Sequence, residues 1–218
     1  MYVALDCDTR DVLDLVLPLE CGGCGAPSTR WCGACAKELS VNPDEPRLIT
    51  PRIDPGVPVL SLGRYAGARR EAIVAVKEHG RADLIGPLAT AMRAGLERLL
   101  TWGVLDTPLT LVPAPTRRSA ARRRGGDPVT RIALAAATEG VTVTRALRLK
   151  AFTRDSVGLS GAERQHNITG RVRLTRPVNG DVLLIDDIVT TGATASESVR
   201  VLGAAGAHVV AVLALANA

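Results

Sequence analysis

Residues 182–194 combine a buried strand, two acids and a glycine-containing loop in one stretch, Val-Leu-Leu-Ile-Asp-Asp-Ile-Val-Thr-Thr-Gly-Ala-Thr. Its four leading apolar residues predict a strand that is buried on both faces, as in a parallel sheet. In such sheets ligands bind where the strands end. Backbone N–H groups and hydroxyls at the start of a helix suit an anion, while paired carboxylates suit sugar hydroxyls or a hydrated Mg²⁺. The stretch therefore predicts a site for a phosphorylated sugar such as a ribose 5-phosphate.

Apolar strands and amphipathic helices alternate along most of the chain. We expect strands at 59–62, 109–112, 182–185 and 209–215, and helices at 69–77, 83–100, 128–138 and 194–204. A capping box at residues 160–163 predicts the start of a further helix. The alternation indicates an α/β fold with a parallel sheet flanked by helices.

Four of the five cysteines form two CxxC pairs that are separated by seven residues, and these are Cys21, Cys24, Cys32 and Cys35. Four thiolates suit a tetrahedral Zn²⁺, and the neighbouring glycines let the backbone fold close to an ion. The alternatives are two disulfides or a thioredoxin-like redox pair, which lacks its βαβ context here. Because four protein ligands leave no open coordination position, we expect a structural zinc site.

The composition indicates two parts with a boundary near residue 58. Residues 1–58 are expected to hold a short apolar helix at 11–17, the cysteine knuckle and a proline-rich linker over 42–58. Residues 59–218 are expected to form the main domain. The first part carries 5 basic and 9 acidic residues, and the second carries 22 basic and 13 acidic residues. A basic main domain suits phosphates, pyrophosphate or nucleic acid, and an arginine-rich solvated surface is the alternative.

Several classes of protein are excluded by composition. With 46% apolar and 22% charged residues, the chain is not expected to be disordered. Only 2% of its residues are aromatic, so the chain has few side chains with which a surface could bind single strands by base stacking. The sequence contains no run of 18 apolar residues and no basic, apolar signal peptide. We therefore expect a cytoplasmic protein without membrane insertion.

The stretch 182–194 resembles the phosphoribosyl pyrophosphate (PRPP) signature of type I phosphoribosyltransferases. Together with the cysteine knuckle and the proline-rich linker, it is similar to the ComF family of competence-associated proteins. Three further segments fit that family: a Lys-x-x-Gly segment within 75–81, a Val-Pro-Ala-Pro and arginine stretch over 112–125, and Leu-Ser-x-x-Glu-Arg-x-x-Asn at 159–167. Where the family commonly continues Arg-Gly-Phe-Asn-Gln, this chain has Arg-Gly-Gly-Asp-Pro, so an aromatic residue and two amides are missing.

The resemblance implies a type I phosphoribosyltransferase-like fold with a small N-terminal zinc module, and a site for PRPP with Mg²⁺. It assigns the phosphate to a loop made of Thr190, Thr191, Gly192, Ala193 and Thr194. It assigns the ribose hydroxyls, directly or through Mg²⁺, to Asp186 and Asp187 as the catalytic pair. The candidates for pyrophosphate binding are Lys77, Arg117 and Arg118, for which surface solvation is the alternative interpretation.

Three hypotheses follow from the resemblance. In the first, the protein transfers ribose 5-phosphate from PRPP to a nitrogen acceptor and releases pyrophosphate. In the second, it is a non-catalytic DNA-uptake factor that binds PRPP together with single-stranded DNA or a helicase partner. In the third, it senses PRPP and regulates through nucleic acid, which the lack of a recognisable helix-turn-helix disfavours. Related folds often dimerise, so a homodimer is one expected state.

Overall fold

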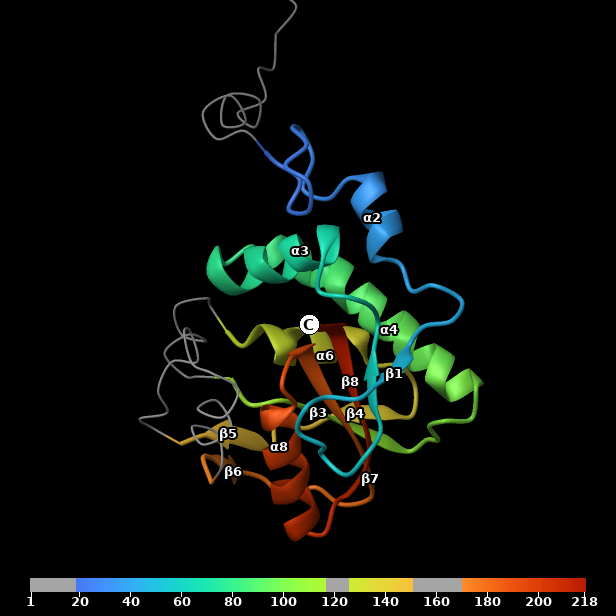
Figure 1. Ribbon diagram of the computed structural model, residues 1–218, viewed down its shortest axis with the longest axis vertical. Coiled ribbons are helices and arrows are strands. Elements are labelled where there is room, and N and C mark those ends of the chain that lie inside the picture. Colours follow the sequence, from blue (N-terminus) through green and yellow to red (C-terminus); the bar gives the residue numbers. More distant parts are fainter. Residues whose placement is uncertain (1–18, 117–125, 151–169) are drawn as a thin grey trace, which may run out of the picture.

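The computed structural model describes residues 19–116, 126–150 and 170–218. Its centre is a six-stranded sheet with the order β1-β2-β8-β7-β3-β4 (Figure 1). The strands are β1 (Arg47–Ile49), β2 (Val59–Ser61), β3 (Leu109–Pro113), β4 (Val141–Val143), β7 (Asp181–Val189) and β8 (His208–Asn217). All neighbouring pairs are parallel except β1 with β2. The predicted parallel sheet is therefore confirmed.

Helices cover both faces of this sheet. Three of them share one hydrophobic core, and these are α3 (Gly67–Glu78), α4 (Ile85–Thr101) and α6 (Pro128–Ala136). The opposite face packs against α8 (Ala193–Ala204) and a two-stranded sheet of β5 (Leu147–Leu149) and β6 (Val172–Leu174). Alternate residues of β7 serve the two cores, since Leu183 lies in the first and Leu184 in the second.

Sequence patterns predicted the long elements well and the short ones poorly. The four expected strands and four expected helices are all present with shifted ends. Asp127 is the N-cap of α6, because its carboxylate oxygen accepts from the Thr130 N–H at 3.3 Å. The strand predicted to end at Ile185 continues to Val189, because β8 pairs with it along that whole length. The expected helices at 11–17 and after residue 160 lie outside the described residues.

The proline-rich segment 42–58 is not only a linker. Its residues 47–49 form β1, which pairs with β2 at the edge of the main sheet. Three residues between prolines carry too short a pattern for sequence to identify, but an edge strand tolerates such neighbours. The boundary near residue 58 stays a prediction, with β1 from the first part completing the sheet of the second.

The cysteine module packs on the main domain through a short helix, α2 (Gly33–Leu39). Leu39 is 3% exposed and belongs to the same core as Leu84 at the end of the 3₁₀ helix η1 (Ala82–Leu84). The Ala68 N–H donates to a Glu38 carboxylate oxygen at 2.8 Å, which ties α2 to the start of α3. Within the described ranges, no helix is long and apolar enough to cross a membrane.

Candidate functional site

The first candidate site lies where β7 extends beyond its neighbour β3. The last paired residues are Pro113 of β3 and Ile185 of β7, and the Ala114 N–H donates to the Ile185 carbonyl at 2.7 Å. On the other side, β8 stays paired with β7 as far as Val189. The residues that follow Ile185 therefore stand at the carboxyl edge of the sheet, where ligands bind in open parallel sheets.

The loop between β7 and α8 encloses a hollow of about 30 Å³, which is lined by Asp186 and residues 188–195. Gly192 precedes the first turn of α8 in the left-handed region, with φ of 84°. The first N–H groups of a helix have no partner within it and favour an anion. One of them, the Ala193 N–H, donates weakly to the Thr191 hydroxyl at 3.4 Å. This geometry suits a small anion such as a phosphate group.

The loop is supported from behind by the segment 51–53. The Ile53 N–H donates to the Thr191 carbonyl at 2.8 Å. A Cβ atom added at Gly192 would lie 2.3 Å from the Ile53 carbonyl oxygen and 2.8 Å from Pro51 Cβ. Gly192 is thus required by its φ angle and also by this close approach. Sequence reasoning missed both supporting residues, because they lie far from the loop in the chain and within an apparent linker.

The two adjacent acids have different neighbours. Asp186 lines the hollow beside α8. Asp187 is 7% exposed and faces α3, where its carboxylate lies 2.7 Å from Lys77 Nζ. The structure therefore places Lys77, the candidate for pyrophosphate binding, in an ion pair with one of the two acids.

Burial and charge both perturb this group of side chains. Burial, followed by the repulsion from Asp187, raises the pKa of Asp186 to about 8, against the opposing effect of Lys77. For Lys77, burial disfavours the charged form, but the combined effect of Asp187, Asp186 and Tyr65 raises its pKa above the ordinary value. One lysine does not neutralise two carboxylates in this setting. The edge therefore favours an added cation or hydrogen-bond donors such as sugar hydroxyls.

Most of the predicted ligand-binding residues come together at this edge. Asp186, Lys77 through Asp187, and the loop Thr190, Thr191, Gly192, Ala193 and Thr194 form one continuous region. Thr190 is exposed, whereas Gly192 and Ala193 are buried. The predicted pyrophosphate ligands Arg117 and Arg118 lie outside the described residues.

The second candidate site is a metal centre formed by the four predicted cysteines. All four sulfur atoms lie within 4.8 Å of one another, and Cys24 Sγ and Cys32 Sγ are 3.6 Å apart. Tetrahedral coordination with bonds of about 2.3 Å places sulfurs about 3.8 Å apart, so the donor set fits zinc. The four cysteines are free, and a separation of 3.6 Å is not a disulfide bond.

The backbone around these cysteines brings their sulfur atoms together and changes the pKa values of their thiols. Burial acts to raise the pKa of the Cys21 thiol, but hydrogen bonds from the backbone, including the Cys32 N–H at 3.3 Å, lower it to about 6. Burial and the neighbouring sulfurs raise the pKa of Cys35. A Cβ atom at Gly23 would lie 2.6 Å from Cys35 Sγ, so glycine is needed for the sulfurs to converge. Four sulfurs held this closely cannot all ionise without a positive ion between them.

Fold and sites together define a class of protein: a parallel α/β domain with a threonine-glycine loop at the carboxyl edge, joined to a module with four clustered cysteines. The chain is similar to the DNA utilization protein YhgH of Escherichia coli K12, with 28% identity over 204 residues that cover 89% of this chain and 82% of the relative. The protein of the same name from Shigella flexneri is 27% identical over the same shares. No protein-family model matches the chain.

Two solved structures are also similar, and both are a hypoxanthine phosphoribosyltransferase from Staphylococcus aureus. The first, in an orthorhombic crystal form, is 18% identical with a TM-score of 0.36, and the match covers 61% of this chain and 62% of that enzyme. The tetragonal form is 19% identical with the same TM-score and the same shares. The chain thus spans about three fifths of the length of that enzyme.

Proposed function

We propose that the carboxyl edge binds PRPP with Mg²⁺ and transfers its ribose 5-phosphate to a nitrogen acceptor, with release of pyrophosphate. The observation that carries the proposal is the hollow at the start of α8, which is lined by both the threonine-glycine loop and Asp186. A phosphate in the hollow would be held by the N–H groups of the helix start. Its sugar would then lie next to the Asp186 carboxylate, which accepts hydrogen bonds from hydroxyls.

In this reaction the residues of the chain would position PRPP and neutralise the charge that develops, and they would not supply a nucleophile. As pyrophosphate leaves C1, positive charge develops on the ribose ring and favours the ionised form of Asp186, whose carboxylate then stabilises that charge. Lys77 would approach the departing pyrophosphate from α3, with its charge maintained by Asp187. Mg²⁺, when bound with the ligand, would neutralise part of the pyrophosphate charge. We assign Zn²⁺ to the cysteine cluster in a structural role, since its four ligands leave no open position.

The test is a phosphorus NMR time course of PRPP with Mg²⁺, the full chain, and a pool of nucleobases and ammonia. We expect pyrophosphate to form with the native chain and not with Asp186→Asn, because the variant lacks the carboxylate that faces the ribose. Asp181→Asn, at the opposite end of β7, is the matched control and should retain turnover. Splitting the pool then identifies the acceptor. PRPP that stays intact while its signals broaden would contradict transfer and favour the role of a PRPP-binding, non-catalytic factor.

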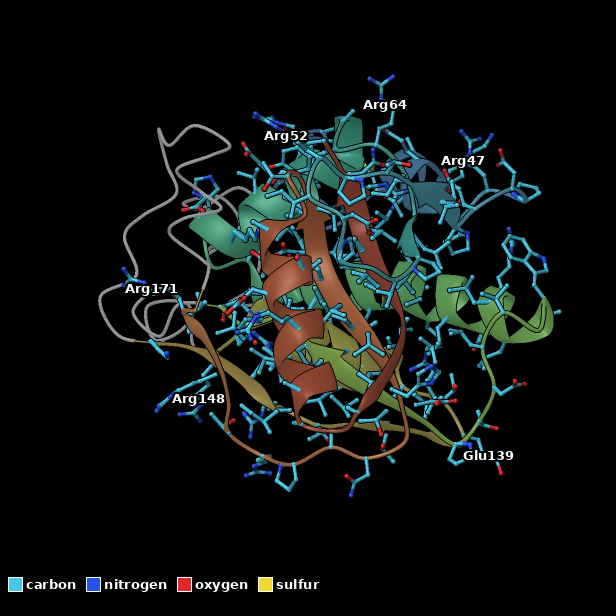
Figure 2. The ribbon with its side chains drawn as sticks, turned by 60° about the horizontal axis from the view of Figure 1, so that its bottom comes forward. Arg47, Arg52, Arg64, Glu139, Arg148 and Arg171 are labelled. Atoms are coloured by element: carbon cyan, nitrogen blue, oxygen red, sulfur yellow. The ribbon has the colours of Figure 1, made fainter. Side chains whose placement is uncertain are left out.

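A second candidate function is binding to the backbone of single-stranded DNA, and the β5–β6 sheet favours it. Arg148 and Arg173 lie directly opposite each other on its exposed face. The segments 145–150 and 170–180 together contain six basic residues and no acid. Figure 2 shows Arg148 and Arg171 on this side of the molecule, away from Arg47 and Arg64. The name of the Escherichia coli relative, DNA utilization protein, agrees with this candidate.

Fluorescence anisotropy with a labelled single-stranded oligonucleotide, repeated at several salt concentrations, tests the second candidate. Affinity should fall with salt, and Arg148→Ser/Arg173→Ser should reduce the logarithmic salt slope by about 0.7 for each phosphate that the variant no longer binds. The matched control, Arg47→Ser/Arg64→Ser, removes the same charge from another side and should leave the slope unchanged. Equal slopes for the two double variants would exclude the β5–β6 sheet as the DNA-binding surface.

A further inference from the structure

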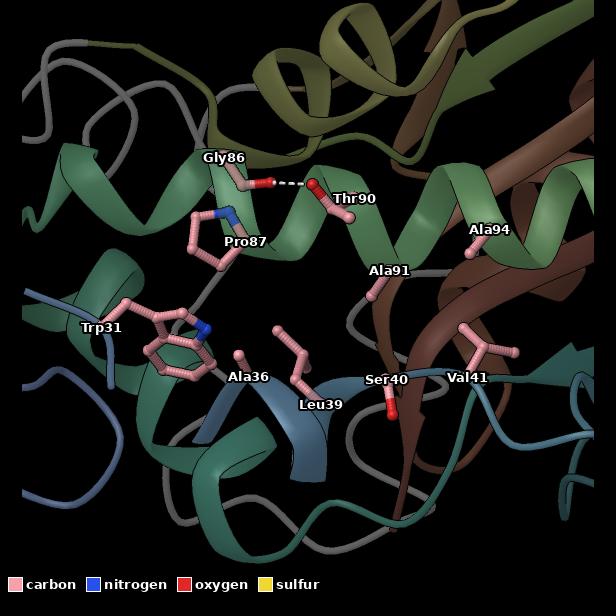
Figure 3. A pocket seen from close by; sticks show the side chains of 10 residues that line it. All are labelled: Trp31, Ala36, Leu39, Ser40, Val41, Gly86, Pro87, Thr90, Ala91 and Ala94. Carbon is pink, nitrogen blue, oxygen red and sulfur yellow. Dashed lines mark hydrogen bonds between the residues drawn. The ribbon is translucent and has the colours of Figure 1, made fainter. Parts of the chain in front are cut away.

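A groove of about 610 Å³ lies between α4 and the part of the cysteine module that holds Trp31 and α2 (Figure 3). One wall is the face of α4 that carries Pro87, Thr90, Ala91 and Ala94, at the spacing of one helical face. The opposite wall is formed mainly by α2, and the Trp31 ring lies at one end. Small side chains along α4 leave space beside it. A trough between two helices with this shape and length suits a third helix.

The lining of the groove favours an apolar occupant. Its two hydroxyl groups already donate within their own elements: Thr90 Oγ1 to the Gly86 carbonyl at 3.1 Å, and Ser40 Oγ to the Lys37 carbonyl at 2.6 Å. Apart from the Trp31 indole at one end, the remaining wall is aliphatic, with Leu39 and Ala91 buried at its base. Burying apolar side chains here would remove apolar surface from water and would leave both hydroxyl groups hydrogen-bonded.

We propose that the groove is the docking site of this chain's own residues 11–17. That segment reads Asp-Val-Leu-Asp-Leu-Val-Leu, and a helix would place Val12, Leu13 and Val16 on one face with Asp11 and Asp14 opposite. Seven helical residues span about 10 Å, which matches the distance along α4 from Pro87 to Ala94 at about 1.5 Å per residue. Pro18 would end the helix before the cysteine module begins.

The position of the neighbouring chain supports this occupant over others. Residue 19 is the first described residue, and the Glu20 carbonyl accepts from Arg81 Nη2 at 3.1 Å. The Gly86 end of the groove follows η1, whose Leu84 would lie 2.3 Å from a Cβ atom added at Gly22. The chain that follows residues 11–17 therefore lies near the Gly86 end of the groove. Charge agrees as well, since residues 1–18 carry four aspartates and one arginine, whereas the main domain is basic.

Hydrogen exchange measured by mass spectrometry on the full chain tests the proposal. We expect slow exchange at the amides of 11–17 in the native chain. Val16→Asp, at the centre of the apolar face, should accelerate exchange about tenfold or more. The matched control Asp14→Ser changes the opposite face and should exchange like the native chain. In a Trp102→Phe background, Val16→Asp should also make Trp31 easier to quench with acrylamide.

Three results would overturn the proposal. The first is rapid exchange of 11–17 in the native chain, and the second is identical protection in the Val16→Asp variant. The third is protection of the α4 wall that increases with protein concentration, which would assign the groove to a second copy of the chain. If Val16→Asp fails to fold, Ala94→Asp changes the half-buried wall of the groove instead and should release the same segment.

Discussion

Single residues decide the chemistry of the sheet edge, and the two adjacent acids are the clearest case. Their motif predicted that they lie at a ligand site, and the structure gives them different neighbours. Asp186 lines the hollow beside α8, whereas Asp187 is paired with Lys77 of α3. The sequence shows the alternation of a strand but not which helix covers each face, so this difference could not be predicted from it.

Asp187→Asn should lower the pKa of Lys77, because burial would then oppose its charge with less compensation. In the native chain this pKa is raised above the ordinary 10.5. The pair therefore stabilises the fold below that pH, and its contribution is lost as the pH rises through the folded-state value. Below pH 10.5, the Asp187→Asn variant should therefore have an unfolding free energy about 1–3 kcal/mol lower than that of the native chain.

Carbon-13 NMR of the lysine side chains measures this titration directly, since the chain has only three lysines. The signals of Lys37 and Lys150 serve as internal references. Asp181→Asn is the control, because it removes a carboxylate of the same strand that pairs with His208 instead. A Lys77 titration that is the same in native and Asp187→Asn chains would show that the ion pair does not exist in solution.

Gly192→Ala should lower the unfolding free energy by more than the cost of the left-handed backbone conformation alone. Its matched control is Gly206→Ala, because Gly206 has a φ of 87°, close to the 84° of Gly192, and open space where a Cβ would be placed. Both variants should lose about 1 kcal/mol of unfolding free energy from the left-handed conformation. Gly192→Ala should lose more, because its Cβ meets the Ile53 carbonyl. Urea unfolding measures both, and equal losses would rule out the support from segment 51–53.

At the scale of helices and strands, prediction succeeded where hydrophobic patterns were long. The periodicity of α4 and the buried run of β8 carried enough residues to identify them. The strands β1, β4, β5 and β6 each have three residues, and their burial patterns include exposed positions. Such strands are specified by neighbours distant in sequence, so local patterns cannot predict them. The support that segment 51–53 gives to the loop was missed for the same reason.

Glu197 of α8 links this helix to the segment that leads into β6. Its carboxylate accepts from the Gly170 N–H at 2.7 Å and from Arg200, whose hydrogen bonds are the main cause of its lowered pKa. The stabilisation is therefore present above the ordinary pKa of 4.5 and is lost as the pH falls through the folded-state value. Glu197→Gln should lower the unfolding free energy at pH 7 and bring little change near pH 2.

Unfolding free energies of the native and Glu197→Gln chains between pH 2 and pH 7 check this link. The control is Glu71→Gln, which changes an exposed carboxylate on α3 and should lose less stability at pH 7. A Glu197→Gln difference that stays constant over the whole pH range would mean that the carboxylate charge does not carry the link.

For the molecule as a whole, the cysteine module and the main domain share a hydrophobic core. Leu39 of α2 packs in the same cluster as α3, α4 and α6. The sequence predicted two parts but could not show this joint packing, because Leu39 and Leu84 come together only in the folded chain. Loss of metal from the cysteines should therefore destabilise more than the module itself.

Cys24→Ser should abolish binding of one zinc ion per chain and lower the midpoint of thermal unfolding, because metal binding contributes to folding. Zinc content by elemental mass spectrometry and unfolding by circular dichroism measure the two effects. The control is Cys7→Ser, the same substitution outside the CxxC pairs, which should keep both the zinc and the midpoint. A zinc-free Cys24→Ser chain with an unchanged midpoint would show that the module does not stabilise the main domain.

The central claim is that the loop at the start of α8 holds the phosphate of a ribose 5-phosphate. The most direct measurement is a nitrogen-15 NMR titration of the full chain with ribose 5-phosphate. We predict the largest shifts at the N–H groups of Thr191, Gly192, Ala193 and Thr194, and a strong reduction of these shifts in the Gly192→Ala variant. Shifts that are absent from this loop, or that are largest on the basic β5–β6 sheet, would contradict the claim.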